Sequence, residues 1–133
     1  MWITSKSFLV WGGWTLLILG VLGFIFPNIG GEYLNFSKVE NWAHALLGIL
    51  ALTIGYGIKD NRILKAVSII FGVAGLIFGI WGFIVAGNPS PNFYGDVNLN
   101  NPIDNIIHLT IAVWALITSK SRHSSAVPQT PRR

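Results

Sequence analysis

Long apolar segments alternate with short polar ones along the whole chain. Four segments contain no charged side chain: 7–31, 41–58, 66–95 and 105–119. An α-helix needs about 20 mostly apolar residues to cross the hydrocarbon core of a bilayer. The first and third segments reach that length, and the other two approach it once their helix starts are included. The pattern therefore predicts an all-α, polytopic membrane protein with four transmembrane helices in one bundle.

Helix-capping residues place the starts of the second and fourth helices. Ser37 and Glu40 have the spacing of a capping box, in which each side chain binds the backbone N–H of the other residue. Asn101 and Asp104 stand in the same relation, with Pro102 at the first helical position. The expected helices are therefore 6–26, 37–58, 61–86 and 101–119.

The distribution of charge predicts the orientation in the membrane. Eight of the nine Lys and Arg residues fall at one set of helix ends, and only Lys38 shares the other set with four acidic residues. Cytoplasmic loops of membrane proteins are enriched in Lys and Arg, so both termini are predicted to be cytoplasmic. Residues 1–120 are expected to form the membrane domain, and 121–133 a disordered basic tail. The predicted location is the bacterial inner membrane, or a thylakoid membrane in a photosynthetic source.

The two halves of the membrane domain resemble each other, with repeat one at about 1–60 and repeat two at about 61–120. Four residues of the first half recur in the second at an offset of 64: Ser37, Glu40, Asn41 and His44 match Asn101, Asp104, Asn105 and His108. The first and third predicted helices both run outward. The repeat is therefore parallel, with a pseudo-two-fold axis along the membrane normal.

Paired transmembrane hairpins whose second helices carry Asn-x-x-His resemble an uncharacterised bacterial membrane family, domain of unknown function 4383. The segments that carry the resemblance are 41–48 and 104–109, and it spans roughly 8–119. Ala112 departs from the first half, which has Gly48 at that point. The resemblance implies a four-helix membrane protein and brings no established activity.

Composition excludes several classes of function. Charged residues make up 11% of the chain, against about 25% in a soluble domain. The net charge of +4 is explained as a topology signal rather than as a nucleic-acid surface. The absence of cysteine excludes disulfides, thiolate metal sites and cysteine nucleophiles. No catalytic or metal-binding motif stands out, so the protein is predicted not to be an enzyme.

Four polar residues inside the spans form a candidate ligand or polar cluster, because a polar side chain in a membrane needs a partner or a purpose. They are Asn41, His44, Asn105 and His108. The asparagine and histidine of each pair are three residues apart and are expected to share a helix face. In one interpretation they hydrogen-bond to backbone or across the pseudo-two-fold axis and tie the second and fourth helices together, in a structural or accessory protein. In the alternative, the two histidines are axial ligands of haem or chlorophyll.

Glycines form a continuous stripe on the third predicted helix, at Gly72, Gly75, Gly79 and Gly82. Small residues at this spacing let two helix backbones approach closely. The stripe is expected to be a packing seam inside the bundle, with a docking face for a second copy or a larger membrane complex as the other interpretation. The lipid bilayer is the remaining expected partner, and nucleic acid is not.

Overall fold

Four α-helices make up the computed structural model, which describes residues 3–26, 36–89, 91, 93–99 and 102–121. The helices are α1 (Ser5–Ile25), α2 (Lys38–Gly57), α3 (Asn61–Val85) and α4 (Pro102–Lys120). Each boundary lies within one residue of the sequence prediction. The described part of the chain has no β-strand, only an isolated bridge between Phe93 and Val97. The all-helical class and the four helices are therefore confirmed.

Local capping explains where the helices begin. In α2 the Ser37 N–H donates to Glu40 Oε2 at 2.5 Å, and the Glu40 N–H donates to Ser37 Oγ at 3.2 Å. The predicted capping box is thus present. At α3 the N-cap is Asp60, whose Oδ1 accepts the Arg62 N–H at 2.8 Å. The predicted N-cap of α4, Asn101, lies outside the described residues, as does nearly all of the predicted tail.

Three of the helices are long and apolar enough to cross a membrane: α1, α3 and α4. At 20 residues, α2 is as long, but the polar residues of its first two turns lower its mean hydropathy. Large apolar side chains also cover the outside of the bundle, including Ile70 and Ile84, which are 65% and 66% exposed. An apolar surface of this extent is unusual in a soluble monomer and is suited to lipid.

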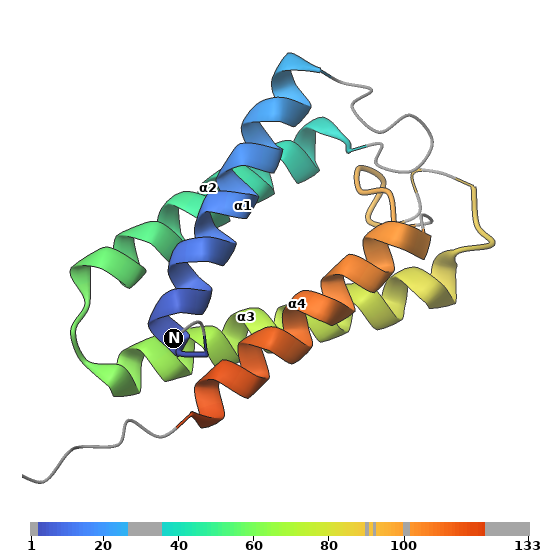
Figure 1. Ribbon diagram of the computed structural model, residues 1–133. Helices are drawn as coiled ribbons and strands as arrows, with labels where there is room; N and C mark the ends of the chain where they lie inside the picture. The colour runs from blue at the N-terminus through green and yellow to red at the C-terminus, as the bar shows by residue number, and fades with distance from the viewer. Residues whose placement is uncertain (1–2, 27–35, 90, 92, 100–101, 122–133) are drawn as a thin grey trace, which may run out of the picture.

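The helices form two antiparallel hairpins, α1 with α2 and α3 with α4 (Figure 1). Between the hairpins, extensive contacts run only from α1 to α3 and from α1 to α4. Figure 1 shows the hairpins close together where α1 and α3 begin and diverging toward the opposite end. Each hairpin is thus a tightly packed unit, and the two units are joined at one end.

An aromatic cluster packs the two hairpins together at this end. Phe8 of α1 is 2% exposed. Its ring lies edge-on to Trp114 of α4 and Phe71 of α3, at centroid distances of 5.0 and 6.4 Å. Edge-to-face pairs of this kind contribute beyond their buried area. Nearby, Ser5 Oγ donates to the backbone oxygen of Thr118 at 3.3 Å, so polar and aromatic contacts coincide here.

Replacing Phe8 tests whether this cluster joins the hairpins. Phe8→Ala should lower the free energy of unfolding by about 3 kcal/mol, because a large buried ring is lost from between three helices. Ile70→Ala is the matched control on the exposed surface and should change it by less than about 0.5 kcal/mol. Unfolding by SDS in mixed micelles measures both. Equal losses in the two variants would contradict the assignment.

Candidate functional site

The asparagine of each Asn-x-x-His motif faces the other helix of its own hairpin. Asn41 is 3% exposed and Asn105 is fully buried. A Cβ built on Gly23 of α1 would lie 2.0 Å from Asn41 Oδ1, and one built on Gly82 of α3 would lie 1.8 Å from Asn105 Oδ1. No side chain fits at those distances. Each asparagine therefore needs a glycine opposite it.

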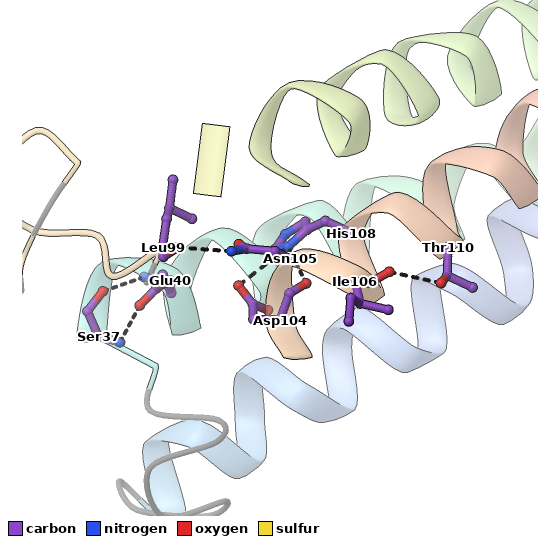
Figure 2. Close-up of polar contacts among 8 residues, drawn as sticks. All are labelled: Ser37, Glu40, Leu99, Asp104, Asn105, Ile106, His108 and Thr110. Carbon is purple, nitrogen blue, oxygen red and sulfur yellow. Dashed lines mark hydrogen bonds and ion pairs between the residues drawn. The ribbon is translucent and has the colours of Figure 1, made fainter. Parts of the chain in front are cut away.

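The amide oxygens of these asparagines have no N–H or O–H donor within reach among the described residues. Each lies in line with a glycine Cα–H bond, because the Cβ position follows the direction of that bond. Cα–H···O contacts recur where helices pack, and each contributes about 0.5–1 kcal/mol. The amide of Asn105 also donates from Nδ2 to the backbone oxygen of Leu99 at 3.2 Å (Figure 2), which ties the segment before α4 to the helix.

The glycine stripe of α3 faces α4 along its whole length. A Cβ at Gly72, Gly75, Gly79 or Gly82 would lie 3.0 Å or less from an atom of α4. All four glycines are buried. The structure thus places the stripe inside the α3–α4 hairpin, as a seam between the two backbones.

A second glycine seam, on α1, was missed by the sequence analysis. Gly13, Gly20 and Gly23 face α2, and a Cβ at Gly20 would lie 2.6 Å from the Ala45 nitrogen. These three glycines precede Gly72, Gly79 and Gly82 by 59 residues each. The sequence does indicate this second seam, because the offset of 59 residues also aligns the similar segments 22–26 and 81–85.

The two repeats differ at one position that packs, where the first has Gly48 and the second has Ala112, and the structure explains this difference. In the first hairpin Gly48 of α2 packs on α1, where its Cβ would lie 2.5 Å from the Leu17 nitrogen. In the second hairpin the glycine is on the other helix, because Gly75 of α3 faces Ala112 with a Cβ distance of 3.2 Å. One glycine at each crossing is enough, whichever helix supplies it.

A cavity of about 210 Å³ lies between the two hairpins. All four helices line it, and Phe36, Val97 and Leu99 from the connecting segments line it too. Most of its wall is apolar. The polar side chains at the cavity come in matched pairs from α2 and α4: Glu40, His44, Asp104 and His108. No lysine or arginine lines it within the described part of the chain.

The structure divides each Asn-x-x-His motif, which corrects the expectation that its two residues share a face. The asparagines face their own hairpin, and the histidines face the cavity. The residues that do share a face are Glu40 with His44 and Asp104 with His108, because positions i and i+4 lie one above the other on a helix. Glu40 and Asp104, expected only to cap helices, are therefore also part of the cavity wall.

His108 is held by Asp104, one helical turn away (Figure 2). Its Nδ1 lies 3.0 Å from the Asp104 backbone oxygen and 3.4 Å from the carboxylate Oδ2. A backbone oxygen only accepts hydrogen bonds, so Nδ1 carries the proton and donates it. In the neutral ring Nε2 then bears a lone pair. The contact fixes both the tautomer and the orientation of the imidazole.

His44 stands in a different environment. Its Nδ1 is buried and makes no hydrogen bond of good geometry among the described residues, although the imidazole still interacts with the Glu40 backbone one turn earlier. The Phe36 ring lies edge-on to the imidazole, with 5.1 Å between centroids. His108 has a comparable neighbour in Phe78, at 6.0 Å. Each imidazole is thus flanked by an aromatic ring.

The carboxylate of Glu40 interacts with groups of both hairpins. It accepts the Ser37 N–H and also interacts with the backbone of Asn98, which precedes α4. Across the cavity, each carboxylate is near enough to the histidine of the other hairpin to interact with it electrostatically, Glu40 with His108 and Asp104 with His44. The described residues nevertheless include no group of three His, Asp or Glu side chains placed to hold a metal ion.

The cavity does not fit a haem or chlorophyll ring. Its two imidazoles are suitable donors for iron or magnesium. Its volume of about 210 Å³, however, is below the range of about 300–1,000 Å³ that holds drug-sized ligands. A tetrapyrrole would have to push the hairpins apart.

The contact between Gly82 and Asn105 can be tested by adding one methyl group. Gly82→Ala should lower the free energy of unfolding by about 1–3 kcal/mol, because the new Cβ overlaps the amide. Gly57→Ala is the control, since that glycine of α2 has nothing within 4 Å of its Cβ position; it should be neutral or slightly stabilising. SDS unfolding in mixed micelles compares the two.

A double-mutant cycle separates this contact from a general intolerance of α3 to larger residues. On an Asn105→Ala background, Gly82→Ala should cost less than it does in the native chain, because the amide that it overlaps is gone. An unchanged cost would show that Asn105 is not the partner.

Comparison of the chain with protein-family models, curated proteins and solved structures found no match. Its function must therefore be inferred from its own residues and their geometry.

Proposed function

We propose that the protein is a non-enzymatic integral membrane protein with a structural or accessory role, built from two parallel hairpin repeats. The observation that carries this proposal is the repeated contact of a buried asparagine with a glycine, Asn41 on Gly23 and Asn105 on Gly82. Equivalent contacts at equivalent positions support a duplicated hairpin. They also account for the buried asparagines of the spans by packing, without requiring a reaction. The resemblance to the family of domain of unknown function 4383, carried by the segments 41–48 and 104–109, is part of the same proposal.

The exposure pattern of α2 supports its assignment as the fourth transmembrane helix. Large apolar side chains lie on its exposed side, with Trp42, Leu46 and Ile49 between 51% and 59% exposed. Its polar residues Glu40 and Asn41 are 8% and 3% exposed. Polar side chains in a membrane span face the protein interior. Part of the lower mean hydropathy of α2 thus comes from residues that lipid does not meet, and the exposed Lys38 lies at the very start of the helix.

The positions of the basic residues support an inner-membrane orientation with both termini cytoplasmic. Lys59, Arg62 and Lys65 lie at the α2–α3 connection, and Lys6 and Lys120 lie at the same ends of α1 and α4. This is the end where the hairpins meet (Figure 1). A single basic end is typical of the cytoplasmic side of a bacterial membrane protein.

Reporter fusions test the membrane placement. A fluorescent protein fused after Lys120 should fluoresce in cells, and alkaline phosphatase fused at the same point should be inactive, because the fusion point is cytoplasmic. Alkaline phosphatase fused within 93–99 should be active, and the protein should stay in the membrane pellet after carbonate washing. An active phosphatase after Lys120, or release by carbonate, would contradict the proposal.

A further inference from the structure

We propose that the cavity between the hairpins binds a lipid-soluble hydroquinone, a single hydroxylated ring with a hydrocarbon tail. The site joins an apolar chamber to two imidazoles, from His44 on one hairpin and His108 on the other. The inference rests on the membrane placement proposed above and adds a ligand to it.

The size of the cavity selects a single ring. A cavity of 150 Å³ lined by Leu, Ile and Phe is large enough to bind benzene in another protein. About 210 Å³ is available here, which accommodates one six-membered ring with small substituents. The neighbouring walls come from Leu47, Phe71 and Ile111, so the ring meets the apolar surroundings that it prefers.

The hydrogen-bonding groups of the cavity wall indicate which polar groups a ligand should carry. The Glu40 carboxylate accepts the Ser37 N–H, and Asp104 Oδ2 lies 3.4 Å from His108 Nδ1. When the imidazole of His108 is neutral, with its Nδ1 proton donated to the Asp104 backbone oxygen, its Nε2 lone pair accepts a hydrogen bond. A hydroxyl group supplies that hydrogen, whereas the carbonyl oxygen of a quinone does not.

The shape of the site suits a flat ring with two oxygen substituents. His44 of α2 and His108 of α4 both line the cavity and come from different hairpins. Phe36 and Phe78 flank the two imidazoles and offer aromatic surfaces to a ligand ring. Extensive packing between the hairpins involves α1 and not α2, and in this proposal the hydrocarbon tail leaves the cavity between α2 and α4.

Three probes with the same tail test the proposal on the full chain in lipid nanodiscs. They are 2-decyl-1,4-benzohydroquinone, its oxidised quinone and decylbenzene, each measured by equilibrium uptake over empty nanodiscs. The hydroquinone should bind saturably, one per chain, and about tenfold more tightly than either other probe, because only it donates to His108. Equal uptake of all three probes, tighter binding of the quinone, or uptake that does not saturate would overturn the proposal.

Two variants locate the site. His108→Leu should reduce the affinity for the hydroquinone about tenfold, to that for decylbenzene. The matched control is Thr110→Val, since the Thr110 hydroxyl donates only to the Ile106 backbone oxygen on the exposed side of α4. Ala74→Phe fills the cavity and should abolish binding while the protein stays monodisperse. Unchanged binding in His108→Leu or in Ala74→Phe would overturn the proposal. If a variant does not fold, the comparison of the three probes on the native chain is the test.

The outcome is separable from that of the proposed function. A chain that is inserted in the membrane with both termini cytoplasmic but does not prefer the hydroquinone contradicts the ligand alone. A chain that is not inserted contradicts both.

Discussion

In each hairpin the amide of a buried asparagine lies directly on the Cα of a glycine, Asn41 on Gly23 and Asn105 on Gly82. Lipid tails are as apolar as leucine, so the hydrophobic effect does little to hold transmembrane helices together. Close backbone packing and a few polar contacts must do so instead. An amide that fits only against glycine fixes both the height and the rotation of the second helix relative to the first. The other contacts within each hairpin follow from that register.

The same register creates the cavity. A helix turns about 100° per residue, so a residue three positions after each asparagine is rotated about 60° from the hairpin seam. His44 and His108 are thereby directed toward the opposite hairpin, and Glu40 and Asp104, four residues earlier, come with them. Glycine seams bring helices together within each hairpin, while between the hairpins only α1 packs closely. The space between α2 and α4 is what remains.

The two halves use equivalent positions differently. Glu40 completes the capping box of α2, whereas Asp104 holds the imidazole of His108. The glycine of the central crossing is on α2 in the first hairpin and on α3 in the second, at Gly48 and Gly75. Packing where two helices cross depends on the combined size of the two facing side chains, so either helix can supply the small residue. The two imidazoles differ in how well they are held, because His108 Nδ1 has a hydrogen bond to the Asp104 backbone oxygen and His44 interacts with the Glu40 backbone without one of good geometry.

The sequence by itself determined the helices and their ends, because apolar runs and capping residues act locally. It also revealed the repeated asparagines and histidines, and the glycine stripe of α3. Only the tertiary structure decided that asparagine and histidine face different ways and that both histidines line one cavity. Helices in lipid are apolar on nearly every side, so no amphipathic stripe marks the buried face. That face is chosen by which glycine an asparagine meets, and this depends on residues far apart in the chain.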